Sequence, residues 1–531
     1  MSITTGEATI RLLARYGVDR VFGIPGVHTL DFCRGLGTGS AVAHVQARHE
    51  QGAGLMADGY ARSTGRPGVA LTISGPGVTN AATALGQAWA DSVPLLLLSS
   101  DADSASLGRG WGMLHEVTDL NAVTRPLTAF SACARRPADV PQLLAQAFAV
   151  FASRRPRPVH ISVPMDVQAQ LTDGDWHPAA LPGRPRPDPA AIARAAELLR
   201  AARAPVLILG GGAAEAGPQA TALAERLGAI VIATNAGKGI VPDTHPLALS
   251  GAISRPEVLR LIAGADVVLA AGTELAETDH YLDRIDLPGR LIRIDIDAGK
   301  MNDLYPAAVP ILSDAAAALG ALLPALGEGA SRPEAAEAAA RARAAIAAGH
   351  SPGEARHARF FAALHEALPP DAIVFGDACQ PGYSGALMFQ ADRPRRWHHA
   401  AGYLTLGPSL PGAIGAKFAN PGTAVAAIIG DGGLMFTAQE LLTAAEHRLA
   451  LPVIVWENGG YRQIRDGMRD GNVPRVGVDG INPDFPLLAR AMRCAYAEPA
   501  SRDAFAESVT GAVAADRPTL ILVHEDADWL D

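Results

Sequence analysis

Short apolar runs alternate with longer amphipathic segments along the chain. In the first third, stretches of helical length separate four strand-like runs, VDRVFGIPG, GVALTIS, VPLLLLSS and RPVHISVP. Strands that alternate with helices indicate a parallel sheet covered by helices. We therefore expect a first α/β domain at residues 1–165.

Two further units repeat this pattern. The second contains APVLILGGG, AIVIATNAGKG, ADVVLAAGTE and LIRIDID, and the third contains AIVFGD, AVAAIIGDGG, LPVIVWENGG and PTLILVHE. A Pro- and Gly-rich linker at 164–189 precedes the second unit, and an Ala-rich stretch at 333–349 follows it as a solvated helical connector. The pattern predicts three consecutive doubly wound parallel-sheet domains, at 1–165, 188–325 and 350–531.

Composition narrows the class of protein. A chain of 531 residues is too long for one hydrophobic core. Its formal net charge of −9 argues against nucleic-acid binding, and its four cysteines form no CxxC pair that would suggest zinc or a disulfide framework. The N-terminal segment is amphipathic, and the apolar runs are too short to span a bilayer. We expect a cytoplasmic protein with no membrane or nucleic-acid partner.

The sharpest local signal is a glycine-rich turn, Gly430–Gly433, that follows the apolar run AVAAII and precedes a helical segment. Glycines at such a turn let backbone N–H groups approach a phosphate, and the helix N-terminus favours negative charge. Asp431 in this turn and Asn458 after the next strand, 27 positions later, reach the same edge of the sheet. Asp, Asn and Gly are also ordinary turn residues, but together at this spacing they favour a phosphate and Mg²⁺ site.

This pattern resembles the cofactor motif of the thiamine-diphosphate-dependent acetolactate synthase and pyruvate decarboxylase family. The resemblance implies that Mg²⁺ is held by the Asp431 carboxylate, the Asn458 side chain and the Gly460 carbonyl. It also implies that the backbone of Gly432 and Gly433 binds the diphosphate, beside Asn458 and Gly460. The family usually has Asn-Asn where this chain has Glu-Asn, and the ligand is the second residue of that pair.

Two other segments of the third unit resemble the same family. GDACQPG is similar to a second diphosphate loop, in which Gln380 would donate a hydrogen bond. YLTLGPSLPGAIGA is similar to the segment around the aminopyrimidine ring. The resemblance implies that the Leu404 carbonyl accepts a hydrogen bond from the 4′-amino group and that Leu406 wedges the cofactor into a bent shape. A core leucine is the alternative interpretation of Leu406.

The first domain supplies an acid. Glu50 opens a helical segment in RHEQGAGLMADGYAR, where a carboxylate commonly complements the helix dipole. With FGIPG before it and ISGPGVTNAATALGQAWADSVPLL after it, however, the segment resembles the family's first domain. The resemblance implies that Glu50 bonds ring nitrogen N1′ and activates the cofactor, and that Pro25 and Asn80 contact the cofactor. It further implies a homodimer or homotetramer with active sites at the subunit interface.

Two histidines are candidates for proton transfer, because histidine titrates near neutrality. His28 follows GIPGV, and His115 lies in GWGMLHEVTD, where acetolactate synthases have Gln. A structural hydrogen bond is the alternative for each. The amino-acid sequence of the first domain and the segment YRQIRDGM most resemble the branch of the family that acts on 5-guanidino-2-oxopentanoate. A buried guanidinium needs carboxylate partners, and the candidates are Glu116, Asp119, Asp466 and Asp470.

The expected function is non-oxidative decarboxylation of a small-molecule 2-oxo acid to an aldehyde, with 5-guanidino-2-oxopentanoate as the candidate substrate. An acetolactate-synthase-like carboligase that joins 2-oxo-acid-derived units is the alternative enzyme, and an inactive cofactor-binding paralogue is a third hypothesis. The glycines of VLILGGGAAEAG in the middle unit miss the G-x-G-x-x-G pattern at Glu215. We therefore expect a structural middle domain without a second cofactor.

Overall fold

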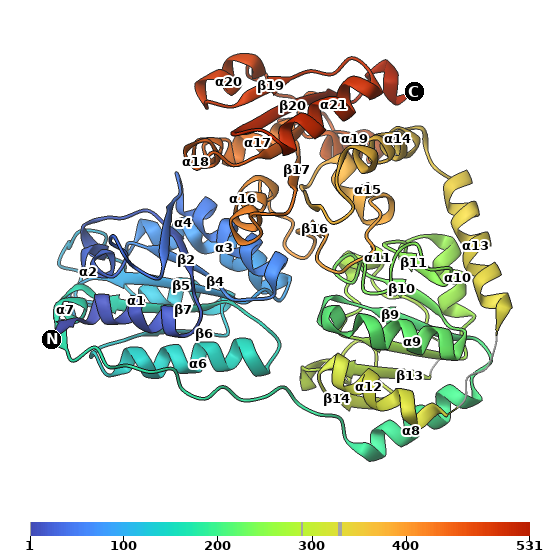
Figure 1. The fold of residues 1–531 in the computed structure, drawn as a ribbon, viewed down its shortest axis with the longest axis horizontal. Helices are drawn as coiled ribbons and strands as arrows, with labels where there is room; N and C mark the ends of the chain where they lie inside the picture. Colours follow the sequence, from blue (N-terminus) through green and yellow to red (C-terminus); the bar gives the residue numbers. More distant parts are fainter. Residues whose placement is uncertain (1, 288–289, 328–331) are drawn as a thin grey trace. The chain divides into compact units, whose positions relative to one another are not determined.

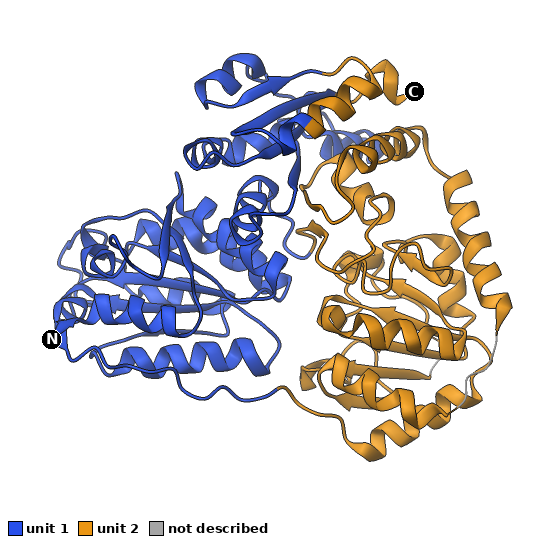
Figure 2. Cartoon of the chain, in the orientation of Figure 1, with its two compact units in different colours: residues 1–183, 402–498, 511–523 blue, residues 184–401, 499–510, 524–531 orange. Residues whose placement is uncertain are grey.

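The computed structural model describes residues 2–287, 290–327 and 332–531. The chain forms two compact units, one of residues 1–183, 402–498 and 511–523 and one of residues 184–401, 499–510 and 524–531 (Figure 2). Three six-stranded sheets run through these units (Figure 1). Among the described residues, no helix is both long and apolar enough to cross a membrane.

The first sheet has the strand order β3-β2-β4-β5-β7-β6, and its neighbouring strands are parallel. Its strands are β2 (Arg20–Gly23), β3 (Ala43–Gln46), β4 (Gly68–Thr72), β5 (Leu95–Asp101), β6 (Phe130–Cys133) and β7 (Val159–Pro164). Its helices are α1 (Thr5–Arg15), α2 (Leu30–Arg34), α3 (Glu50–Thr64), α4 (Pro76–Ala90), α5 (Leu120–Thr124), α6 (Asp139–Ser153) and α7 (Met165–Ala169). Strand β1 (Ile3–Thr4) pairs with β8 (Leu171–Thr172), so elements beside the first sheet continue past residue 165.

The second sheet has the parallel order β11-β10-β9-β12-β13-β14. Its strands are β9 (Pro205–Leu209), β10 (Ile230–Ala233), β11 (Ala248–Ser250), β12 (Val267–Ala271), β13 (Leu291–Asp295) and β14 (Val309–Leu312). The surrounding helices are α8 (Pro189–Ala201), α9 (Gly217–Leu227), α10 (Pro256–Ala263), α11 (Glu277–His280), α12 (Ala315–Leu326) and α13 (Pro333–Ala348). Successive residues of β9 enter two different apolar clusters, which confirms that helices cover both faces of this sheet.

Helix α13 is the Ala-rich stretch that we expected to be a solvated connector. Its residues Ala339, Ala342 and Ile346 instead belong to the buried cluster on one face of the second sheet. They recur at helical spacing, so they form a narrow apolar stripe that the surrounding alanines mask in the sequence. The helix is therefore part of the middle core, beyond the predicted boundary at 325.

The third sheet has the order β16-β15-β17-β18-β20-β19. Its strands are β15 (Ile373–Gly376), β16 (Trp397–His399), β17 (Val425–Gly430), β18 (Leu451–Glu457), β19 (Ala495–Ala497) and β20 (Pro518–His524). Its helices are α14 (Pro352–Ala367), α15 (Gln380–Met388), α16 (Ser409–Ala419), α17 (Asp431–Thr437), α18 (Glu440–Glu446), α19 (Arg462–Asp470), α20 (Phe485–Ala491) and α21 (Arg502–Val513). The three sheets confirm the predicted fold class, whereas the boundaries at 165, 188, 325 and 350 stay predictions.

Helices α3 and α16 join the first and third sheets within the first unit. Their backbones touch, because a Cβ atom on Gly59 would lie 2.0 Å from the carbonyl oxygen of Gly412. A Cβ atom on Gly415 would lie 1.9 Å from the carbonyl oxygen of Met56. Only glycine permits such an approach. This contact fixes the start of α3, where Glu50 lies, relative to the start of α16.

Candidate active site

Asp431 is the first residue of α17, directly after β17, and only 1% of it is exposed. Its Oδ2 accepts hydrogen bonds from the backbone N–H groups of Gly459 and Gly460, at 2.9 and 3.0 Å. Asn482 donates to the same oxygen at 2.9 Å. In the part of the chain that the structure describes, no cationic side chain pairs with Asp431. A buried carboxylate with only neutral donors favours a bound cation.

Asn458 follows β18 at the same edge of the sheet. Its side-chain Oδ1 is buried and has no hydrogen-bond partner among the described residues. Its backbone carbonyl accepts a hydrogen bond from Arg465 at 2.9 Å. A buried oxygen without a donor is rare, and a hard cation takes oxygen ligands of this kind. The Asp431 and Asn458 side chains therefore fit a Mg²⁺ ion.

The segment that contains Leu404 is held from α4. The Asp91 carboxylate, at the end of that helix, accepts the N–H of Gly402 at 2.8 Å. The side-chain oxygen of Gln87 accepts the N–H of Thr405 at 3.3 Å. Leu404 between these anchors has φ of 50°, a conformation that side chains rarely adopt. The anchors hold the Leu404 carbonyl in a defined direction.

The same segment is also bonded to α17. The hydroxyl of Thr437 donates to the carbonyl oxygen of Gly407 at 2.8 Å. A Cβ atom on Gly407 would lie 3.0 Å from the carbonyl oxygen of Gly433. Leu406 therefore lies one residue from a contact with the glycine turn, which brings two of the predicted cofactor segments together.

Asp91 also belongs to a largely buried ion cluster, in which Arg62 pairs with Asp58 and, at 2.8 Å, with Asp91. We expect D91A to lower the free energy of unfolding by about 3 kcal/mol, because it removes one of the carboxylates that pair with the largely buried Arg62. Urea unfolding measures this change. D470A, which removes an exposed carboxylate, should stay within about 0.5 kcal/mol of the wild type. Equal losses in both variants would exclude a special role for the cluster.

Glu50 is the first residue of α3. The side-chain amide of Asn80 on α4 donates to Glu50 Oε2 at 2.9 Å. Two residues predicted from the first domain therefore lie in contact. Pro25, the third, lies exposed in the turn after β2. Gln380 begins α15 in the other compact unit.

His28 and His115 lie against each other. Their ring centroids are 4.9 Å apart in an edge-to-face arrangement. His28 is buried, and its Nδ1 lies 2.6 Å from the Oγ of Ser74. Burial and the neighbouring charge of His115 lower the pKa of His28. Protonation of His28 is therefore disfavoured in this position.

The four carboxylates considered for a guanidinium substrate already have partners. Glu116 accepts the backbone N–H groups of four residues in its own loop: Gly110, Trp111, Gly112 and Met113. Asp119 caps α5 at Ala122. Asp466 pairs with Arg462 and Arg469, and Asp470 pairs with Arg469. Each has a structural role that competes with substrate binding.

The structure adds residues that the sequence motifs did not identify. From remote segments, each bonds a predicted site residue or a residue within two positions of one: Ser74, Gln87, Asp91, Glu440 and Asn482. Ser74, Gln87 and Asp91 lie inside the quoted first-domain motif, so that motif contained a signal for them. Asn482 lies 51 residues after Asp431 in an irregular segment, where no sequence pattern marks it.

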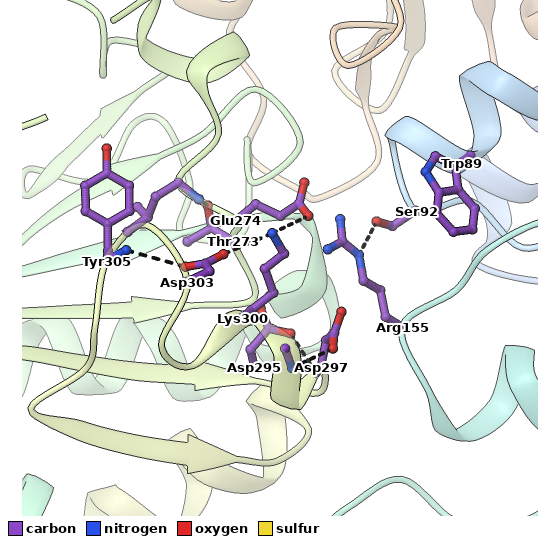
Figure 3. A network of polar contacts seen from close by, with 12 residues as sticks. Trp89, Ser92, Arg155, Thr273, Glu274, Asp295, Asp297, Lys300, Asp303 and Tyr305 are labelled. Carbon is purple, nitrogen blue, oxygen red and sulfur yellow. Dashed lines mark hydrogen bonds and ion pairs between the residues drawn. The ribbon is translucent and has the colours of Figure 1, made fainter. Parts of the chain in front are cut away.

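The carboxyl edge of the second sheet is the usual ligand position in such a fold. There a Cβ atom on Gly272 would lie 2.5 Å from the backbone of Gly212, so two glycine turns pack against each other. Nearby, Lys300 bonds Asp303 at 3.0 Å and Glu274 at 3.3 Å (Figure 3). These contacts give the two glycine turns and the Lys300 ion pairs a structural role.

Comparison with known proteins identifies the family. Three descriptions match: "Thiamine pyrophosphate enzyme, N-terminal TPP binding domain" at residues 3–123, the central domain at 192–322 and the C-terminal TPP binding domain at 377–523. The chain belongs to the thiamine pyrophosphate enzymes. Thiamine diphosphate is its cofactor, and Mg²⁺ is the usual partner metal in this family.

Named relatives lie within this family. The chain is 50% identical over 506 residues to the "Probable 2-ketoarginine decarboxylase AruI" of Pseudomonas aeruginosa, which covers 94% of this chain and 90% of that protein. It is 33% identical over 515 residues to an acetolactate synthase of Mycobacterium bovis, covering 93% and 83%. It is 32% identical over 516 residues to the acetolactate synthase isozyme 3 large subunit of Escherichia coli, covering 92% and 88%.

Proposed function

We propose that this enzyme decarboxylates a 2-oxo acid without oxidation and releases an aldehyde, and that 5-guanidino-2-oxopentanoate (2-ketoarginine) is its substrate. The observation that carries the proposal is the contact between His28 and His115, whose ring centroids are 4.9 Å apart. Aldehyde release requires a proton on the reacting carbon, and the buried His28 with the half-buried His115 beside it can deliver one. The relative named for 2-ketoarginine, at 50% identity, supports this substrate.

The residues for the cofactor fall into two groups. Asp431, Asn458 and the Gly460 carbonyl would hold Mg²⁺, with the turn at 432–433 against the diphosphate. Glu50, oriented by Asn80, would hold a proton at ring nitrogen N1′. When bound, thiamine diphosphate supplies the carbon nucleophile and stores the electron pair after CO₂ leaves. The protein's own part is to orient the ring, place these protons and exclude water.

We also propose a homodimer or homotetramer with active sites at the subunit interface. Around the cofactor segment and the helices after β17 and β18, large apolar side chains are exposed: Tyr403, Leu404, Met435, Phe436 and Ile464. Apolar side chains gathered beside a site are typical of a surface that a partner covers. A cytoplasmic location is proposed as well, supported by four free cysteines.

The alternative is carboligation of two 2-oxo-acid-derived units, which the acetolactate synthases among the relatives support. Product analysis separates the two. The protein, loaded with thiamine diphosphate and Mg²⁺, is given pyruvate, phenylpyruvate or 5-guanidino-2-oxopentanoate. We expect CO₂ and the matching aldehyde from the guanidino acid. Acetolactate from pyruvate as the main product would replace the proposal with the alternative.

His115 offers a direct test of the proton donor. We expect H115Q to lower aldehyde release about 100-fold, because glutamine cannot act as an acid near neutral pH. CO₂ release and aldehyde formation are measured separately, because loss of the proton donor slows aldehyde formation, the step that follows CO₂ release. The exposed His177 provides the control H177Q, which should keep full activity. Full aldehyde release by H115Q would remove His115 from the mechanism.

A further inference from the structure

The turn before α3 is held by a carboxylate from a distant part of the chain. Glu440, the first residue of α18, is fully buried. Its Oε1 accepts the N–H of Arg48 at 3.1 Å and the N–H of His49 at 3.0 Å. Its Oε2 also accepts the N–H of Arg48, at 3.1 Å. These two residues directly precede Glu50, so Glu440 fixes the backbone from which that side chain projects.

The first turn of α3 also lies against this carboxylate. A Cβ atom on Gly52 would lie 2.2 Å from Glu440 Oε1. A side chain at position 52 would therefore displace the Glu440 carboxylate. The Glu440 carboxylate touches both the turn before Glu50 and the helix that Glu50 begins, so a change at Glu440 acts on Glu50 through the backbone.

Thr443, one turn further along α18, makes this contact sensitive to a proton. Its hydroxyl oxygen lies 2.9 Å from Glu440 Oε2 and 3.2 Å from the carbonyl oxygen of Gln46. A hydroxyl has one proton to donate. When Glu440 is ionised, Thr443 donates to it and Gln46 loses this donor. When Glu440 is protonated, it donates to Thr443, which donates to Gln46.

The surroundings bring the ionisation of Glu440 into the neutral pH range. Burial raises the pKa of Glu440 to about 7, while the N–H groups and charge of the turn oppose this rise. The guanidinium of Arg48 pairs with Glu446 on the same helix. On the packed helices, Glu50 of α3 bonds Asn80, Asp58 and Arg62 of α3 pair with each other, and Lys417 of α16 bonds two backbone carbonyls.

We propose that Glu440 is a positioning residue for Glu50, and that its proton, relayed by Thr443, switches the hydrogen bonds of the turn at 46–49. The proposal rests on the proposed role of Glu50 as the cofactor-activating acid. It predicts that activity responds to an ionisation that belongs to a residue outside the reacting centre.

The first readout needs neither cofactor nor turnover. Hydrogen exchange of the peptide 44–52 is measured in the cofactor-free protein, relative to exchange from an unstructured peptide. We expect E440A to exchange the Arg48 and His49 amides at least about 10-fold faster, because both lose their acceptor. E440Q keeps an oxygen acceptor and an N–H donor toward Thr443, so it should retain wild-type protection. Wild-type protection in E440A would overturn the proposal.

The second readout is the pH dependence of kcat. We expect the wild type and T443S to show an ionisation near pH 7 that is missing in E440Q and T443V. The matched control E446Q removes a partly exposed carboxylate from the same helix and should keep the ionisation. An unchanged ionisation in E440Q would refute the switch, and E440Q and T443V decide the matter even where E440A does not fold. Absence of CO₂ from every 2-oxo acid with the wild type would instead refute the proposed function, and the exchange result would stand.

Discussion

E50Q is expected to lower turnover about 1,000-fold while thiamine diphosphate binding changes less than about threefold. Glutamine keeps the size of the side chain and a hydrogen bond to Asn80, but it cannot exchange a proton with ring nitrogen N1′. Cofactor affinity is measured by fluorescence titration, and turnover by CO₂ release at saturating cofactor.

The control for this experiment is E337Q, on the exposed face of α13, where the same chemical change should leave both quantities unaltered. Turnover in E50Q within about threefold of the wild type would show that another group activates the cofactor. A parallel loss of cofactor binding would show that Glu50 mainly holds the ring.

D431A should weaken thiamine diphosphate binding in the presence of Mg²⁺ by about 100-fold or more, because it removes a proposed metal ligand and the only charge in the proposed ligand set. The effect of Mg²⁺ on affinity should disappear, which titration of cofactor with and without Mg²⁺ measures. N458A should give a similar loss, since its buried Oδ1 has no other partner among the described residues.

D470A is the matched control for D431A, because Asp470 is an exposed carboxylate on α19, the helix that follows Asn458. It should keep wild-type affinity and the same dependence on Mg²⁺. An unchanged Mg²⁺ dependence in D431A would place the metal elsewhere in the protein.

Central strands of all three sheets could be predicted from the sequence, whereas several edge strands could not. Within the three six-stranded sheets, the strands without a prediction were β6, β11, β14, β16 and β19, and each lies at an edge of its sheet. They have three or four residues, and several are partly exposed. Central strands such as β5, buried on both faces, produce an unbroken apolar run. Edge strands produce no such run, so pairing rather than composition defines them.

The site residues also divide into those that the sequence predicts and those that it does not. Asp431, Asn458 and Glu50 lie at strand-to-helix junctions, where sequence motifs and sheet topology together specify position. Asn482 and Glu440 act on them from segments that only the tertiary structure brings near. The substrate carboxylates were uncertain for a related reason, because loop residues such as Glu116 can be used either within the loop or toward a ligand.

The touching backbones of α3 and α16 have a consequence for how substrate range can evolve. Where Gly59 meets Gly412, a single added methyl group would force the helices apart, and so would displace Glu50 from the cofactor segment. The contact between α3 and α16 therefore does not tolerate a stepwise increase in side-chain size. Mutational libraries aimed at new 2-oxo acids should therefore leave it intact and draw their diversity from the loop at 107–118. Within that loop the exposed Trp111 and Leu114 are the positions to vary, while His115, the proposed proton donor, is kept.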